Sequence, residues 1–146
     1  MDIRPAVEAD LDEICALIRE LAVFERLEHE VVLEVDAVRG HLFGPTPAAQ
    51  VTLAEVDGGV AGFALWFTTF STFLGRPGIW LEDLFVRPEH RGAGIGRSLL
   101  GHLQSISPGR VEWAVLDWNT EAQAFYRTMG AAPQDEWTTW RWRVRG

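Results

Sequence analysis

The sequence contains no lysine, so all 13 of its strongly basic residues are arginine. This absence excludes a phosphate-binding loop that relies on a lysine, and it excludes mechanisms that form a Schiff base on a lysine amine. The single cysteine, Cys15, cannot form an internal disulfide. Because the chain also opens without a basic and apolar leader, we expect a cytoplasmic location.

Net positive charge and long apolar runs are also missing. The net charge of -8 at pH 7 argues against a nucleic-acid partner, which would need a basic surface. The uncharged stretch at residues 58–75 holds four glycines and several hydroxyl side chains, so we expect buried strand and loop there and no membrane span. The four histidines and one cysteine lack metal-ligand spacing, so no metal is expected.

Acidic residues gather in the first part of the chain. Residues 1–57 hold 13 acids and 4 arginines, whereas residues 58–146 hold 8 acids and 9 arginines. The first part suits a cationic ligand, although a solvated acidic face explains the same pattern. With 146 residues, of which 47% are hydrophobic, the chain is predicted to form a single globular domain over residues 1–146.

Hydrophobic periodicity predicts an α/β (α+β) protein with a mixed sheet and the element order βααβββαβαβ. Asp10 and Glu13 resemble a capping box at the start of the first helix, and Asp57-Gly58-Gly59 predicts a hairpin turn. The predicted strands are Ile3–Val7, Gln50–Val56, Val60–Phe70, Ile79–Val86, Val111–Leu116 and Trp137–Val144, and the predicted helices cover Leu11–Leu21, Glu34–Phe43, Ile95–Leu103 and Thr120–Met129.

Three glycines, Gly92, Gly94 and Gly96, lie between the fourth predicted strand and the next helix. Glycine allows positive φ and close approach of a phosphate, so backbone N–H groups can hold an anion here, with Arg91 and Arg97 completing a pyrophosphate clamp. A loop without a ligand is the alternative. A dinucleotide fingerprint, and with it a nicotinamide-dependent oxidoreductase, fits less well because Arg97 stands where the third glycine belongs.

The pattern R-x-x-G-x-G, formed by Arg91, Gly94 and Gly96, resembles the pyrophosphate-binding motif of the GNAT superfamily of N-acetyltransferases. The likeness extends over nearly the whole chain, which resembles the spermidine/spermine (diamine) branch. It rests on Ile3–Ala6, Ile18–Ala22, Leu81–Val86 and Trp118–Gly130. The resemblance implies a homodimer and a mixed, mostly antiparallel sheet of about six to seven strands with four helices, in which strands four and five splay apart.

The implied reaction transfers an acetyl group from acetyl-CoA to a primary amine of a small diamine, polyamine or thialysine-like acceptor, by direct attack through a tetrahedral intermediate. A non-catalytic acyl-CoA-binding or dimerisation module is the alternative. Backbone N–H groups along Leu84–Val86 would receive the thioester carbonyl. The residues that the resemblance implies for acetyl-CoA binding are Leu84, Phe85, Val86, Arg91, Gly92, Ala93, Gly94, Ile95, Gly96, Arg97, Asn119 and Tyr126.

Two side chains are candidates for moving protons. Glu82, on the strand with the thioester site, is the candidate base, acting through a water; a structural ion pair is the alternative. Tyr126, the only tyrosine, is the candidate acid for the leaving thiolate, with an ordinary helix aromatic as the alternative. Asn119 is predicted to cap the helix that bears Tyr126.

The acceptor side is expected to be acidic. Asp83 should point away from Glu82, because strand side chains alternate, and should anchor the amine or contact a second subunit. Glu25, Glu28 and Glu30 lie in a segment that resembles the acidic edge of a polyamine pocket, and a solvated acidic face is the alternative.

Two segments depart from the polyamine enzymes or leave alternatives open. Residues 71–73 lack the usual Asp and Trp, and Pro77-Gly78 suggests a slightly longer loop, which weakens polyamine preference and leaves acetyl transfer intact. The tryptophan-rich strand Trp137–Val144 is interpreted either as core or as a dimer interface.

Overall fold

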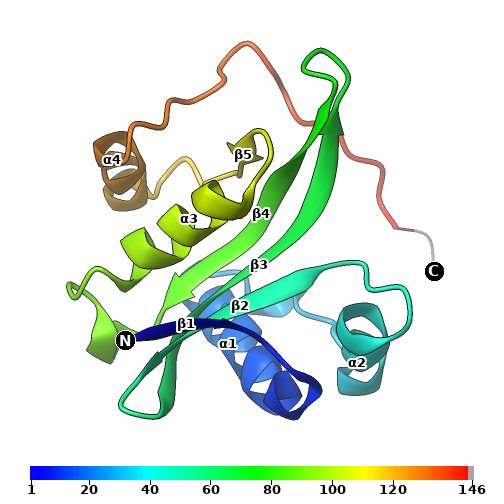
Figure 1. Ribbon diagram of the computed structural model, residues 1–146, viewed down its shortest axis with the longest axis vertical. Helices are drawn as coiled ribbons and strands as arrows, with labels where there is room; N and C mark the ends of the chain where they lie inside the picture. The colour runs from blue at the N-terminus through cyan, green and yellow to red at the C-terminus, as the bar shows by residue number, and fades with distance from the viewer. Residues whose placement is uncertain (145–146) are drawn as a thin grey trace. The chain divides into compact units, whose positions relative to one another are not determined.

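The computed structural model describes residues 1–144, and Figure 1 shows the course of the chain. Two compact units follow each other in sequence, residues 1–114 and residues 115–146. That they form one domain stays a prediction. The first unit holds β1 (Asp2–Pro5), α1 (Leu11–Phe24), α2 (Val35–Phe43), β2 (Gln50–Val56), β3 (Gly59–Ser71), β4 (Arg76–Val86), α3 (Ile95–Ile106) and β5 (Val111–Glu112), with the short 3₁₀ turns η1 (Glu8–Asp10), η2 (Glu28–Glu30) and η3 (Pro88–His90); the second holds α4 (Thr120–Thr128).

The strands form one mixed sheet in the order β1-β2-β3-β4-β5. The first four are antiparallel neighbours, and β5 runs parallel to β4. Asp57 and Gly58 both have positive φ, 52° and 79°, which gives the two-residue turn whose twist suits a hairpin. The predicted hairpin between β2 and β3 is therefore confirmed, as is the mixed α/β fold.

The main core lies between α1 and the middle of the sheet. Leu53, Phe63 and Phe85 share one face because Phe63 pairs with Leu53 on β2 and with Phe85 on β4. This face packs against a stripe of apolar α1 residues at helical spacing, Ile14, Leu17 and Leu21. Helix α3 packs with its own buried stripe on the same strands, from the other face of the sheet, and Figure 1 shows it lying along β4.

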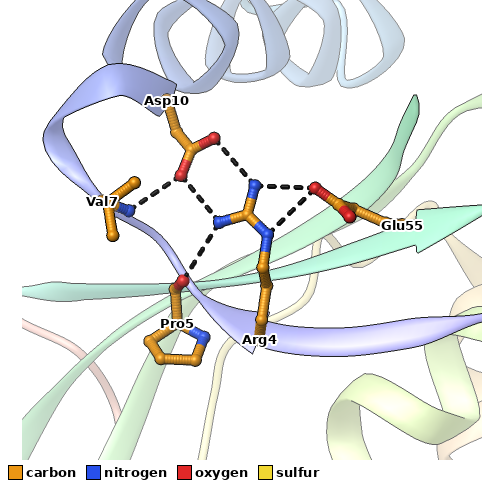
Figure 2. A network of polar contacts seen from close by, with 5 residues as sticks. All are labelled: Arg4, Pro5, Val7, Asp10 and Glu55. Carbon is orange, nitrogen blue, oxygen red and sulfur yellow. Dashed lines mark hydrogen bonds and ion pairs between the residues drawn. The ribbon is translucent and has the colours of Figure 1, made fainter. Parts of the chain in front are cut away.

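The start of α1 differs from the predicted capping box. The Asp10 side chain makes no cap hydrogen bond to α1; instead it accepts the N–H of Val7 at 2.8 Å and two bonds from the Arg4 guanidinium, at 2.8 and 2.9 Å. Arg4 also binds Glu55 of β2, so it fastens β1, η1 and β2 together, as Figure 2 shows. A bidentate arginine is a stronger partner for Asp10 than a helix amide, which explains the outcome.

The end of the sheet is shorter than predicted. The fifth strand covers Val111–Glu112 and not Val111–Leu116, and Trp137–Val144 forms no strand, so residues 1–144 contain five strands instead of six or seven. Trp137, Trp140 and Trp142 are 78%, 91% and 99% exposed. Alternating apolar residues form a strand only where a neighbour supplies ladder hydrogen bonds and burial, and this segment has neither within its unit.

The loop suggested by Pro77-Gly78 is also absent. Both residues belong to β4, where Pro77 pairs with Phe70 and Gly78 with Thr69. The connection between β3 and β4 is the tight turn at residues 72–75, which Gly75 makes possible with a φ of 65°.

Candidate active site

Strand β4 leaves its neighbour β5 after a short contact. The two strands pair only at Ile79 with Val111 and at Trp80 with Glu112, whereas β4 continues to Val86. Beyond Trp80, the backbone amides of β4 that face this side have no β5 ladder partner, so the predicted separation of strands four and five is present. Exposed backbone donors of this kind can receive a carbonyl oxygen as it gains charge.

A β-bulge shapes the same stretch of β4. The register passes from Leu65 opposite Asp83 to Trp66 opposite Leu81, so Glu82 is the extra residue. Bulges re-aim side chains and are frequent beside active sites. Glu82 is exposed, and its Oε2 accepts the Trp80 indole N–H at 3.1 Å.

Asp83 is half-buried and strongly perturbed. Burial raises the pKa of its carboxyl to about 7, and the negative charges of Glu82 and Glu25 add to the effect. A carboxyl whose pKa lies near neutrality beside two further acids is a marker of a functional site. That Asp83 points away from Glu82 stays a prediction, and the charge of Glu82 acts on Asp83 from the neighbouring position.

Glu25 arrives from the end of α1. It is the C-cap residue of that helix, its N–H donates to Leu21, and burial raises the pKa of its carboxyl. The structure therefore brings Glu25, Glu82 and Asp83 together, and we call these three residues the carboxylate cluster. Glu28, predicted beside Glu25, lies exposed in η2 and does not act on Asp83 in this way.

The glycine loop has the backbone that the sequence predicted. Gly92 and Gly94 have φ values of 85° and 80°, a region that only glycine adopts readily, and Gly94 is the N-cap of α3. A glycine cap offers no side-chain acceptor to the first-turn amides, which remain suited to an external anion. Ala93 and Arg97 are exposed, Gly96 is half-buried in the first turn, and buried Ile95 anchors the loop in the core.

The exposed residue Arg91 makes side-chain contacts with the end of β4 and with α1. Its Nε donates to the carbonyl of Val86 at 2.9 Å, and its guanidinium carbon lies 4.6 Å from the ring centroid of Phe24 and 5.5 Å from that of Phe85. The two rings are themselves 6.3 Å apart. Phe85 is buried, while Leu84 and Val86 are half-buried.

Asn119 and Tyr126 belong to the second unit. The Asn119 Oδ1 accepts the N–H of Ala122 at 3.1 Å, so the predicted cap of α4 is present. Tyr126 is half-buried, and its ring centroid lies 5.6 Å from that of Phe125. Gly130, with a φ of 86°, ends the helix as predicted.

Arg87 and Phe24 are residues that the sequence prediction missed. Arg87 binds Glu13 and Glu20 of α1, and Phe24 stacks on Arg91 and Phe85. Arg87 and its partners are separated by 67 and 74 residues, and no spacing rule connects them. A phenylalanine at the end of an amphipathic helix likewise predicts an ordinary core residue, so the sequence gives no signal for the contact of Phe24 with Arg91.

Comparison with known proteins gives the family. Residues 11–131 match the acetyltransferase (GNAT) family. The chain belongs to the GNAT family. It is therefore an acetyltransferase that takes its acetyl group from acetyl-CoA, and the predicted family and cofactor are confirmed, whereas the oxidoreductase interpretation is not.

Individual relatives of this GNAT enzyme agree with that assignment. It is 36% identical to the thialysine N-epsilon-acetyltransferase of Bos taurus, with 94% of this chain and 88% of the relative covered. It is 32% identical to an L-ornithine N5-acetyltransferase of Arabidopsis thaliana, over 92% and 81% of the two chains. An integron cassette protein from the mobile metagenome of V. cholerae has the same fold, with a TM-score of 0.81, 24% identity and coverage of 98% and 92%.

Residues 1–144 lack two other kinds of feature. None of the helices there is long and apolar enough to cross a membrane. Within the same residues, His, Cys, Asp and Glu side chains nowhere form a group of three or more that would hold a metal ion.

Proposed function

We propose that this GNAT enzyme acetylates a primary amine of a small diamine, polyamine or lysine-like acceptor by direct attack on acetyl-CoA. The observation that carries the proposal is the carboxylate cluster, Glu25, Glu82 and Asp83, at the point where β4 separates from β5. An ammonium group is the natural partner for three clustered acids. The names of the relatives support this class, because thialysine and ornithine both end in a primary amine.

The donor is held mainly by backbone in this proposal. The amides of residues 92–97 and the start of α3 receive the pyrophosphate, because Gly92 and Gly94 open the loop and the helix dipole favours an anion. The Arg91 side chain stabilises the start of the loop through its hydrogen bond to the Val86 carbonyl and its cation–π contact with Phe24. Unpaired amides between Leu84 and Val86 receive the thioester carbonyl.

Proton movement follows from the cluster. Asp83 and Glu25 hold the incoming ammonium, whose positive charge drives the proton off Asp83. Glu82, exposed to water, accepts the ammonium proton through a water molecule, because only the neutral amine attacks. The amine nitrogen then bonds to the thioester carbon, the C–S bond breaks as the tetrahedral state collapses, and the nitrogen releases its second proton to water to leave the amide.

Tyr126 completes the reaction in the proposal. The departing thiolate takes a proton from the Tyr126 hydroxyl, and the phenol is reprotonated from solvent. A phenol with a pKa near ~10 can protonate a thiolate with a pKa near ~8.5 at modest cost. Asn119 supports this role by fixing the first turn of the helix that carries Tyr126.

We also propose that the enzyme is a cytoplasmic homodimer. The exposure of Trp137, Trp140 and Trp142 supports a second copy, since alternating aromatic residues favour interfaces. Cys15 is buried and unpaired, as expected in a reducing compartment. Sedimentation of the full chain measures the oligomeric state, and a monomer at micromolar concentration would contradict the proposed homodimer.

The function is tested by thiol release from acetyl-CoA with a panel of acceptors. Thialysine, ornithine, putrescine and spermidine should release thiol, whereas free glycine, whose only amine is beside a carboxylate, should not. The matched variant E82Q should lower turnover by about 10²-fold, within the range for a lost general base. Absence of amine-dependent thiol release across the whole panel would overturn the proposal.

A further inference from the structure

Arg87 directly follows β4 and takes no part in the proposed chemistry, yet most of its guanidinium is engaged. Its Nε and Nη2 donate to the two carboxylate oxygens of Glu20, at 3.1 and 2.9 Å. Its Nη1 donates to Glu13 and, at 3.0 Å, to the carbonyl of Val60. The Arg87 side chain is only 17% exposed. One residue thus fastens α1, the start of β3 and the end of β4.

The contacts of Arg87 with Glu13 and Glu20 connect α1 to the end of β4, and these two elements carry the carboxylate cluster. Arg87 lies four residues beyond Asp83 along the chain from β4, and Glu20 lies five residues before Glu25 on α1. On a rigid helix those five residues span about 7 Å, so any slide or rotation of α1 moves Glu20 and Glu25 together. Phe24, the neighbour of Glu25, has its ring centroid 6.3 Å from that of Phe85, two residues beyond Asp83, so the contact of Glu20 with Arg87 and the position of the α1 end on β4 are mechanically coupled.

We propose that Arg87 is a positioning residue for the amine site: by holding Glu13 and Glu20 it sets where the end of α1 lies on β4, and so keeps Glu25 beside Asp83. The inference rests on the proposed function, which makes these carboxylates the amine site. Arginine is required because a lysine cannot offer the two-pronged donor that Glu20 receives.

The charged groups around Asp83 determine in which direction its pKa should change when Arg87 is replaced. Glu82 acts from its own strand and Glu25 from α1, and both raise the pKa of Asp83. Arg91 stacks on Phe24 and Phe85 at the same junction. Arg87 is not among the charges that shift the pKa of Asp83, and loss of a cation does not lower the pKa of an acid, so deleting the Arg87 charge without movement of α1 would not lower that pKa. Deleting it with release of α1 lowers that pKa, because Glu25 moves away and water enters.

Arg4 supplies a matched control. It also grips two carboxylates, Asp10 with two bonds and Glu55, and its side chain is 29% exposed. Its partners are Asp10 in η1 and Glu55 on β2, so neither belongs to α1 or β4, from which the carboxylate cluster comes. The variant R4Q should therefore lower stability about as much as R87Q and leave Asp83 unchanged.

The experiment titrates Asp83 by carbon NMR in the wild-type chain, R87Q, R87K, E20Q and R4Q. We expect the Asp83 midpoint to fall by about one unit or more in R87Q, which is a tenfold change in proton affinity, and to fall less in E20Q and R87K. R4Q should titrate like the wild type. An unchanged or raised midpoint in R87Q, R87K and E20Q would overturn the inference, as would an equal fall in R4Q.

Steady-state kinetics then separate this inference from the proposed function. R87Q should raise KM for the amine by about tenfold and leave KM for acetyl-CoA within about twofold, because misplacement affects only the acceptor side. An equal rise in both constants would contradict positioning. Failure of the wild-type chain to turn over any amine would remove the proposed function, while the NMR comparison would still decide the role of Arg87.

Discussion

Replacement of Asp83 by asparagine should stabilise the folded protein at alkaline pH while it weakens amine binding. The Asp83 pKa is raised from 3.8 to about 7 by burial and by the charges of Glu82 and Glu25. At ~1.4 kcal/mol per pKa unit, ionising this carboxyl in the folded state costs up to about 4 kcal/mol. Because the side chain is only half-buried, we expect about 2–4 kcal/mol.

The sign of the pH dependence follows from linkage. The folded state keeps the Asp83 proton up to about pH 7, whereas the unfolded state releases it near 3.8. Ionisation therefore lowers the free energy of unfolding of the wild type progressively as pH rises through this window. Asparagine has no charge to lose, so the stability advantage of D83N is near zero at about pH 4 and reaches its full value at about pH 8.

Urea unfolding of the wild type and D83N at several pH values measures this difference. The exposed Asp135 is a matched control, since D135N removes the same charge and should leave a nearly constant difference. The D83N variant should also raise KM for the amine at about pH 8, because the ammonium loses Asp83 as an anchor. A D83N advantage that is independent of pH, or that shrinks as pH rises, would refute the reasoning.

Three further predictions concern other parts of the molecule. G94A should raise the dissociation constant for coenzyme A by about tenfold in calorimetry, since alanine at a φ of 80° costs about 1–2 kcal/mol; G101A, with open space around it, should not. Y126F should lower kcat by about 10²-fold with unchanged circular dichroism; equal turnover would mean that the thiolate leaves unaided. The pKa of Asp10 is lowered by its bonds to Arg4, so D10N should reduce urea stability at neutral pH and lose that effect in acid; a constant deficit would contradict the ion pair.

Local signals predicted the backbone of the glycine loop and the starts of α3 and α4 well. Positive φ at Gly92 and Gly94, the glycine start of α3 and the Asn119 cap all depend on a few neighbouring residues. Each follows from the conformational freedom or hydrogen-bonding capacity of one residue type. The contiguous sequence between the end of β4 and α3 therefore carries its own structural explanation.

The acceptor side could be predicted only in part, because its geometry is non-local. Glu25 and Asp83 were each candidates, but their mutual effect depends on how α1 packs on β4. The bulge at Glu82 arises from the way β4 pairs with β3, and the alternation of side chains along β4 alone does not reveal that pairing. The predicted strand Trp137–Val144 failed for the same reason: its pattern was correct for a strand, but a strand also needs a neighbour.

The absence of lysine can be related to the structural roles of Arg4 and Arg87. Arg4 and Arg87 each hold two carboxylates, with Asp10 and Glu20 held through paired bonds, a geometry that needs a planar fork of donors. A lysine at either position would offer one rotating ammonium, and a side-chain primary amine would then exist in an enzyme that acetylates amines. Arginine meets the structural need without adding such a group, because its guanidinium stays protonated and is a poor nucleophile at neutral pH. An all-arginine set of cations is thus consistent both with how the elements are fastened and with an amine site reserved for the substrate.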